Sequence, residues 1–350
     1  MGISRKTWGY FPAGADFPER EIQLFTLENS AGYRARISNY GATLTGLEVP
    51  VGSQMVDVVL GFDYLREYID DSNYMGASIG RVAGRISGAT FTLDGQEFIL
   101  DANEGNSHLH GGNTGFHNQI WEIAAIRPYE ENPSITLSLH SPHGSGGYPG
   151  NLHVQATFTL LGTDLNISYR AECDKPTPLN ITSHPYFNLA GAGSPIDNHE
   201  LNIFSTESIK LDNSLLPNGE IINTAGTKSD FSNFVLIGKN AQDRFFILEN
   251  DQEKLVPAAV ARCNESGLEL EVRTNQRGVQ LYTADGVING IHGKNGLEYG
   301  SRCGFCIEPM GYPDAVNRQE FPSVILNPGE KYYHSTEYRF RNYTAAPENN

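Results

Sequence analysis

Two segments of the chain carry side chains suited to acid–base chemistry. Residues 177–191 hold His184 in a polar loop flanked by aromatic residues, and residues 306–314 hold Glu308 just after an apolar run typical of a buried strand. An imidazolium and a carboxylate that face one small cavity can donate a proton at one point of a substrate while removing one at another. That pairing suits the opening and closing of a sugar ring, a reaction that needs no metal, nucleotide or redox cofactor.

Side chains of the kinds that bind sugar hydroxyls occur in four other segments. A guanidinium donates several fixed hydrogen bonds, and carboxylates and amides accept or donate in one plane. The candidates are Arg85 in a glycine-rich segment, His110 before two glycines, Asp243 before an aromatic run and Gln280 on an apolar strand. Arg81 lies four residues before Arg85, and on a strand both would face the same side. Surface arginines and a structural histidine are the alternative interpretation.

Three aromatic residues are candidates for the face on which the C–H surface of a sugar rests. They are Trp121, Tyr148 and Phe187. Core packing is the commoner fate of such large side chains, because each buries a large apolar area.

The spacings His108-x-His110 and Cys303-x-x-Cys306 are also compatible with a metal site. A His-x-His pair begins the metal site of cupin-like barrels, but those sites need a carboxylate a few residues later, and the next one here is Glu122. The cysteine pair has no second pair and lies in a segment typical of a strand. We therefore predict structural thiols and no metal, with a metal-dependent, cupin-like isomerase as an alternative.

Alternation of apolar and polar residues recurs along the chain and predicts strands with one buried and one wet face, as antiparallel sheets have. Examples are residues 33–39, 153–160, 165–170, 268–273 and 336–340. Turn signals separate the runs, and residues 62–70 are the one convincing short helix candidate. The prediction is an all-β fold, a large antiparallel β-sandwich of two stacked sheets with very little helix.

No repeat, low-complexity linker or block of charge marks a domain boundary within the 350 residues. All-β domains can exceed 200 residues. We therefore predict a single β-sandwich domain over residues 1–350, with frayed termini at residues 1–12 and 345–350.

Composition limits the partners that the chain can have. The 41 acidic residues outnumber the 25 basic ones, for a formal charge of -16. Such a surface repels nucleic acid and anionic membranes, so a neutral small molecule is the expected ligand. The N-terminus lacks a signal-type apolar region, and no apolar run approaches the ~20 residues that span a membrane. Four scattered cysteines fit a reducing cytoplasm.

Taken together, these segments resemble the aldose 1-epimerase family, also called galactose mutarotase, over nearly the whole chain. The motifs occur in family order at residues 39–42, 80–85, 109–112, 148–150, 177–191, 216–220, 280–283, 308 and 321–323. The resemblance implies a galactose mutarotase-like supersandwich with its active site in a concave cleft. It also implies an isomerase that interconverts the α and β anomers of free aldohexoses such as galactose and glucose, as a monomer or homodimer.

The resemblance carries two catalytic roles over to this chain. Glu308 matches the general base, which takes the proton from the C1 hydroxyl. His184 matches the general acid, which protonates the ring oxygen. A neighbouring carboxylate favours the imidazolium, and the imidazolium keeps the carboxylate ionised. We therefore expect a bell-shaped pH profile with a plateau around neutrality.

Substrate-binding roles follow in the same way. His110 matches a second histidine near the ring oxygen, whereas Arg85, Asp243 and Gln280 match residues that hold sugar hydroxyls. The chain departs from the family pattern at two positions, where Gly84 replaces an asparagine and Met310 replaces a glutamine. Both departures could alter substrate preference, but neither affects the acid or the base.

Two rival functions remain open from the sequence besides the metal-dependent isomerase. A non-catalytic carbohydrate-binding β-sandwich would explain the aromatic and amide residues without needing both Glu308 and His184. A hexose-6-phosphate 1-epimerase on the same fold would need several extra basic residues in the cleft, and the acidic balance of the chain disfavours it.

Overall fold

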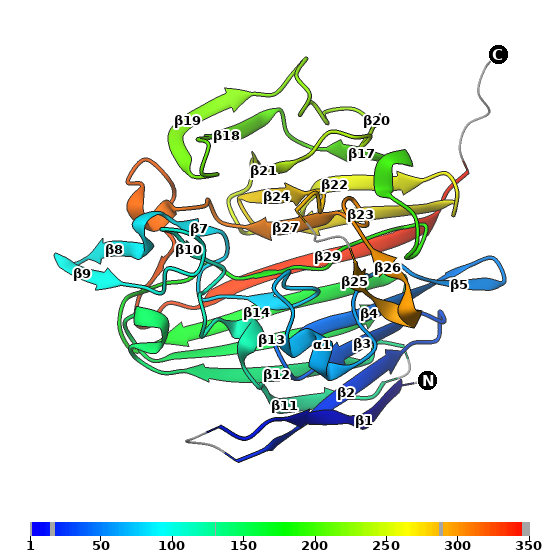
Figure 1. Ribbon diagram of the computed structural model, residues 1–350, viewed down its shortest axis with the longest axis horizontal. Helices are drawn as coiled ribbons and strands as arrows, with labels where there is room; N and C mark the ends of the chain where they lie inside the picture. Colours follow the sequence, from blue (N-terminus) through cyan, green and yellow to red (C-terminus); the bar gives the residue numbers. More distant parts are fainter. Residues whose placement is uncertain (1, 15–17, 130, 287–289, 345–350) are drawn as a thin grey trace.

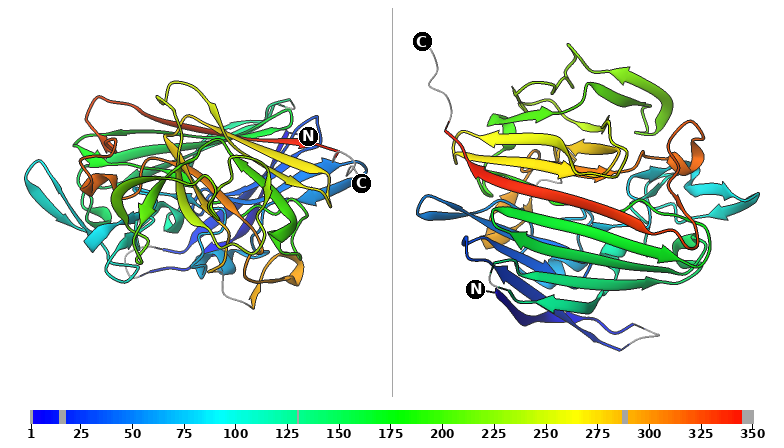
Figure 2. Two further views of the ribbon diagram at one scale, coloured as in Figure 1. Left: turned by 90° about the horizontal axis from the view of Figure 1, so that it is seen from above. Right: turned by 180° about the vertical axis from the view of Figure 1, so that it is seen from behind.

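Three large antiparallel β-sheets contain most of the strand residues of the structure, a computed structural model that describes all residues except 1, 15–17, 130, 287–289 and 345–350 (Figure 1). The largest sheet has nine strands, in the order β11 (Glu122–Arg127), β12 (Ser134–Ser141), β13 (Leu152–Leu161), β14 (Asp164–Cys173), β29 (Tyr332–Asn342), β23 (Leu268–Thr274), β22 (Val256–Cys263), β17 (His199–Ile203) and β20 (Val235–Leu236). Seen from behind in Figure 2, β29 runs through the middle of this sheet.

Two five-stranded sheets lie against the nine-stranded one. The first contains β1 (Gly2–Phe11), β2 (Arg20–Glu28), β3 (Arg34–Ser38), β4 (Thr43–Val51) and β5 (Gln54–Asp57). The second has the order β19 (Pro217–Asn223), β18 (Glu207–Leu211), β21 (Asp243–Ile247), β24 (Gly278–Tyr282) and β27 (Cys306–Met310). The second sheet carries most of the predicted site residues.

Five short strand pairs, one α-helix and six 3₁₀ helices make up the remaining regular structure of the described residues. The pairs are β6 (Ser78–Ile79) with β16 (Thr182–Ser183), β7 (Arg85–Ile86) with β10 (His108–Leu109), β8 (Thr90–Leu93) with β9 (Gln96–Ile99), β15 (Thr177–Pro178) with β28 (Ile325–Leu326), and β25 (Ile291–His292) with β26 (Glu298–Tyr299). The helix α1 spans Leu65–Ile69. None of the helices among the described residues has the length and hydrophobicity needed to cross a bilayer.

The core lies between the inner faces of these sheets, so the predicted β-sandwich is confirmed. One continuous apolar cluster takes residues from β2, β3 and β4, from β12, β13, β14, β22, β23 and β29, and from β24 and β27. Alternation explains the layering: Val154, Ala156 and Phe158 of β13 are buried, whereas His153 and Gln155, which alternate with them, are exposed. The five strands expected from alternation all occur, and the helix is shorter than predicted.

One prediction for the termini is wrong. Gly2–Phe11, within the segment expected to be frayed, forms β1 and pairs with β2 along its length. A strand paired in this way satisfies its backbone polar groups, which holds the N-terminal segment in place. Residues 345–350 lie outside the described part of the chain.

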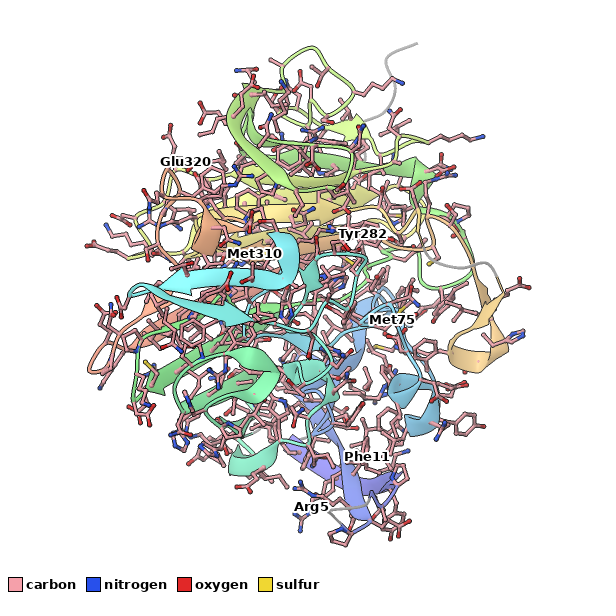
Figure 3. All side chains as sticks on the ribbon, turned by 60° about the vertical axis from the view of Figure 1, so that its left-hand side comes forward. Arg5, Phe11, Met75, Tyr282, Met310 and Glu320 are labelled. Atoms are coloured by element: carbon pink, nitrogen blue, oxygen red, sulfur yellow. The ribbon has the colours of Figure 1, made fainter. Side chains whose placement is uncertain are left out.

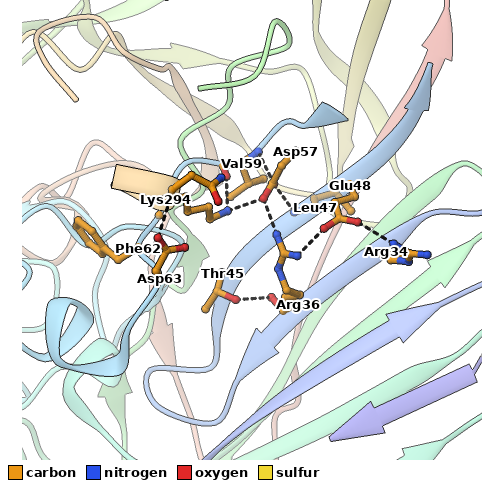
Figure 4. Close-up of polar contacts among 12 residues, drawn as sticks. Arg34, Arg36, Thr45, Leu47, Glu48, Asp57, Val59, Phe62, Asp63 and Lys294 are labelled. Carbon is orange, nitrogen blue, oxygen red and sulfur yellow. Dashed lines mark hydrogen bonds and ion pairs between the residues drawn. The ribbon is translucent and has the colours of Figure 1, made fainter. Parts of the chain in front are cut away.

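A chain of partly buried charges ties the first five-stranded sheet to the segment that connects β24 with β27 (Figure 4). The ammonium Nζ of Lys294 donates to Asp57 Oδ2 at 2.8 Å and to the carbonyl oxygen of Val59 at 2.7 Å. Arg36 bridges Asp57 Oδ2 at 2.6 Å and Glu48 Oε1 at 2.5 Å. The β24–β27 connection, which begins next to the site described below, is thereby anchored to β3, β4 and β5.

Candidate active site

Three of the predicted site residues lie on one face of the second five-stranded sheet. Gln280 of β24 is directly opposite Glu308 of β27, and Asp243 lies two residues from the partner of Gln280 on β21. Residues at these register positions share a face because side chains alternate along a strand. The amide Nε2 of Gln280 donates to Asp243 Oδ1 at 2.5 Å, which fixes both side chains beside Glu308.

His184 reaches the same face from the loop after β16. Its backbone N–H donates to the carbonyl oxygen of Ala77 at 2.9 Å, and its own carbonyl accepts from the N–H of Gly76 at 2.9 Å. These bonds hold the loop so that the imidazole Nε2 lies 3.5 Å from Glu308 Oε1. Both side chains are buried, at 4% and 2% exposure, so the acid and the base predicted from distant segments meet in one place.

His110 lies beside His184, in the loop after β10. The two imidazole rings are 5.4 Å apart and perpendicular. His110 has a left-handed backbone conformation, and its Nδ1 accepts a hydrogen bond from the backbone N–H of Gly84 at 3.2 Å. Because Nδ1 is an acceptor, neutral His110 carries its proton on Nε2. This histidine is therefore set up as a hydrogen-bond donor.

Arg85 occupies the opposite side of the site and is held by two acids. Its Nε and Nη2 donate to the two carboxylate oxygens of Glu104 at 2.6 and 2.8 Å, and its Nη1 lies 3.7 Å from Asp243 Oδ2. The fork of two parallel bonds fixes the plane of the guanidinium. Glu104, which sequence reasoning missed, therefore positions the predicted binding arginine.

Arg81 does not share this position, so the expectation that both arginines face one side is wrong. Gly84 has φ +78°, a left-handed conformation that turns the backbone between them. The Arg81 guanidinium instead donates to the backbone carbonyl oxygens of Ser141, Pro142 and Pro149 at 2.9, 3.0 and 2.7 Å. It is a buried structural cation, and burial lowers its pKa to about 10.

A pocket of about 650 Å³ joins these groups. Its lining includes all six predicted site residues, namely Arg85, His110, His184, Asp243, Gln280 and Glu308. Of the two fates considered for Trp121, Tyr148 and Phe187, core packing is the one found, because each is at most 1% exposed. The aromatic residues that line the pocket are Tyr74, Tyr186 and Tyr282, of which Tyr282 is labelled in Figure 3.

Tyr74 is the aromatic residue most closely connected to the histidines. It has φ +59°, which is unfavourable for a bulky side chain, and its ring lies 4.8 Å from that of His110 and 6.2 Å from that of His184. Strained backbone of this kind persists where surrounding contacts enforce it. No pattern in a single sequence marks such a residue, because its place depends on loops from three distant segments.

Burial dominates the protonation of the acid–base pair, contrary to the mutual charging expected from the sequence. It lowers the pKa of His184 to about 4. Burial also raises the pKa of Glu308 well above its usual range; Asp243 adds to this rise, and Arg85 opposes it. Between these two pKa values the pair holds one proton, as a protonated carboxyl beside a neutral imidazole. Moving that proton across the 3.5 Å gap gives the carboxylate and imidazolium without a change in total charge.

His110, His184 and Glu308 also place three potential metal-binding atoms within 4.8 Å of one another. An imidazole binds a metal through an unprotonated nitrogen. The Nδ1 lone pair of His110 is already used by the N–H of Gly84, which leaves a protonated Nε2. The trio therefore fits hydrogen bonding to a substrate better than metal binding.

Comparison with known proteins agrees with this geometry. The aldose 1-epimerase family model matches residues 23–339. A galactose mutarotase from Bos taurus is 41% identical over 349 residues, which cover 97% of this chain and 99% of that protein. An aldose 1-epimerase from Haemophilus influenzae is 35% identical over 345 residues, covering 94% and 97% of the two chains.

Solved structures give the same result for the fold. A crystal structure of an aldose epimerase homologue from C. elegans superimposes with a TM-score of 0.84 at 28% identity, covering 91% of this chain and 98% of that one. The nine-stranded sheet and its two smaller partners thus form a fold shared with that homologue. By sequence and structure, the chain belongs to the aldose 1-epimerase family.

Proposed function

We propose that the protein is an aldose 1-epimerase that interconverts the α and β anomers of free hexoses such as galactose and glucose. The observation that carries this proposal is the 3.5 Å contact between His184 Nε2 and Glu308 Oε1 inside the pocket. The two oxygens of a hemiacetal are bonded to one carbon, so a base for one and an acid for the other must lie a few ångströms apart.

The reaction begins with the transfer of two protons. Glu308, as the carboxylate, removes the proton from the C1 hydroxyl while His184, as the imidazolium, protonates the ring oxygen O5. The C1–O5 bond breaks, and C1 becomes the aldehyde. Rotation about C1–C2 then presents the opposite face of the carbonyl to the O5 hydroxyl. Reclosure returns one proton from O5 to His184 and another from Glu308 to O1, so the enzyme ends in its starting state.

The remaining residues hold the sugar during this exchange. Arg85 and the Nε2–H of His110 are donors, Asp243 is an acceptor, and Gln280 can both donate and accept. Because Asp243 and Gln280 are bonded to each other, they present one fixed polar edge to the ring hydroxyls. Such positioning keeps C1 between the acid and the base.

The charges in the pocket favour a free sugar over a phosphorylated one. Four acids line it, namely Glu104, Asp243, Asp285 and Glu308, against the two cations Arg85 and Arg244. Arg85 is already paired with Glu104 and lies near Asp243. The phosphate group of a sugar phosphate would have to compete with these carboxylates for the Arg85 guanidinium. The cytoplasmic location and the monomeric or homodimeric state expected from the sequence stay predictions.

Polarimetry of freshly dissolved α-galactose tests the proposal. The native protein should accelerate the approach to the equilibrium rotation, whereas Glu308→Gln and His184→Ala should each lose about 10²–10⁴-fold in kcat, the typical worth of one proton-transfer catalyst. Glu172→Gln, which removes a charge from the exposed side of β14, is the matched control and should keep full activity. A carbohydrate-binding protein without catalysis would bind galactose but leave the rate unchanged. Near-normal activity of either site variant would refute the assignment.

A further inference from the structure

Strand β27 supplies a partner for each nitrogen of the His184 ring. Cys306 and Glu308 lie two residues apart and so face the same side of the strand. The Sγ of Cys306 lies 3.5 Å from Nδ1, while Glu308 Oε1 lies 3.5 Å from Nε2. Cys306 is fully buried, and the second carboxylate oxygen of Glu308 has no hydrogen-bond partner among the described residues. One rigid strand thus fixes both edges of the imidazole.

The partner of His184 differs from those of two other buried histidines. His108 Nδ1 lies 2.8 Å from the carbonyl oxygen of Asp101, and His334 Nδ1 lies 2.9 Å from that of Ile181. A carbonyl oxygen only accepts, so it keeps the proton on Nδ1 in every state of the ring. A thiol is a weak donor and a weak acceptor, and rotation about its Cβ–Sγ bond exchanges the two roles.

His184 exchanges its proton through Nε2, so Nδ1 carries a proton in both the imidazolium and the neutral ring. The thiol sulfur, 3.5 Å away, can accept a weak hydrogen bond from Nδ1–H in both states. We propose that Cys306 is a positioning residue that orients His184 with Nε2 toward Glu308 and serves as its hydrogen-bond partner in both protonation states. This inference rests on the proposed acid role of His184.

The thiol itself remains protonated. Burial raises the pKa of Cys306 well above its usual range, and the charge of Glu308 adds to this rise. A protonated thiol is a poor nucleophile, which is consistent with a positioning role. The other titratable groups that face the His184 ring are His110, His117, Tyr74, Tyr186 and Glu308.

Replacement of Cys306 by alanine and by serine tests the inference. Cys306→Ala removes the partner of Nδ1 and should lower kcat about 2- to 12-fold, the worth of one hydrogen bond, with little change in KM. Cys306→Ser keeps a group that both donates and accepts, so it should recover part of the loss. Cys263→Ala removes another buried sulfur, on β22 and outside the lining of the pocket, and should leave kcat unchanged.

Nitrogen-15 NMR of the His184 ring gives a readout that a loss of packing alone would not move. The native protein and Cys306→Ser should show the same dominant tautomer, whereas Cys306→Ala should show a mixture of the two. Native kcat and native ring shifts in Cys306→Ala would overturn the inference. If His184→Ala retains activity, the proposed acid role fails instead, so the two failures are distinguishable.

Discussion

A Cβ atom on Gly84 would lie 3.8 Å from the Cε methyl of Met310, so the two positions that depart from the family pattern are neighbours in the pocket wall. The same Cβ would lie 3.5 Å from the Cβ of Pro313. Met310, labelled in Figure 3, is 1% exposed and lies two residues after Glu308 on β27. Where the resemblance leads one to expect two amides, this chain has a small apolar surface.

Because they are neighbours, substitutions at these two positions should be coupled. Met310→Gln alone buries an amide without a partner and should reduce the free energy of unfolding by about 1–3 kcal/mol. At Gly84, where φ is +78°, asparagine should be tolerated better than most other side chains, since asparagine adopts the left-handed region more readily. In the double variant the two amides can bond to each other, and part of the loss should be recovered, with a coupling of about 0.5–3 kcal/mol.

Urea denaturation of the native protein, both single variants and the double variant completes this thermodynamic cycle. Strictly additive effects, within about 0.5 kcal/mol, would mean that the two side chains do not meet.

Replacement of the two arginines of the glycine-rich segment should affect different properties, namely substrate binding for Arg85 and stability for Arg81. Arg85→Ala removes charged hydrogen bonds to the sugar and should raise KM by about 10- to 150-fold, from about 1.5–3 kcal/mol of lost binding. Its melting temperature should fall less than that of Arg81→Ala, because its partner Glu104 is 39% exposed and stays solvated. Arg81→Ala leaves several buried carbonyl oxygens without a donor and should instead lower the melting temperature. Steady-state mutarotation and thermal unfolding of both variants separate the two roles, and exchanged outcomes would contradict the assignment.

This contrast also marks how far sequence alone could predict the structure. Alternation of apolar and polar residues identified β13, β14, β23 and β29, because each of these strands buries one face and exposes the other. The same logic placed Glu308 on a buried strand. Arg81 and Arg85 could not be separated, because the turn at Gly84 changes their direction and depends on contacts with distant loops.

Residues that act through another side chain could not be identified from the sequence either. Glu104 and Tyr74 lie in loops whose sequences resemble many surface loops, and their roles arise only when Arg85 and His110 are brought beside them. Likewise Trp121 and Phe187 could not be assigned to core or cleft, since a large aromatic residue suits both.

The partly buried charges in Figure 4 should contribute to stability through Asp57. Burial alone would raise the pKa of Asp57, but Lys294 and Arg36 outweigh it, and the net shift is downward. The pKa of Lys294 is also lowered, because its burial outweighs its attraction to Asp57. For Lys294, the free-energy cost of burying the ammonium therefore exceeds its gain from the attraction to Asp57. The main effect of the ion pair is to specify where the β24–β27 connection docks.

Removal of Lys294 should consequently be destabilising. Lys294→Ala leaves Asp57 with Arg36 as its only cation among the described residues and should cost about 3 kcal/mol, the lower end for breaking a buried pair. Lys210→Ala, which removes an exposed cation paired with Glu220, is the control and should unfold like the native protein. Equal midpoints in urea for the two variants would contradict the anchoring role.

The same network gives a pH dependence of defined sign. Since the native pKa of Asp57 is below its unfolded value of ~3.9, its contribution is fully present above about pH 4 and is lost as the pH falls through the native pKa. Asp57→Asn should therefore be less stable than the native protein at pH 7, and the difference should shrink in acid. A difference that grows as the pH falls would contradict the downward shift.

The rate of mutarotation should show a bell-shaped pH profile whose limbs belong to the His184–Glu308 pair. Between the lowered pKa of His184, about 4, and the raised pKa of Glu308, the pair holds the single proton that the mechanism needs. Below this range a second proton enters and the base is lost; above it the proton leaves and the acid is lost.

Asp243→Asn removes a negative charge that helps to raise the pKa of Glu308, so it should move the alkaline limb to lower pH. The profile of kcat/KM, compared between Asp243→Asn and the native protein, measures this shift separately from any loss of binding. An alkaline limb that moves to higher pH, or a rate that stays flat from acid to beyond pH 9 (about two units above neutrality), would show that this pair does not control the reaction.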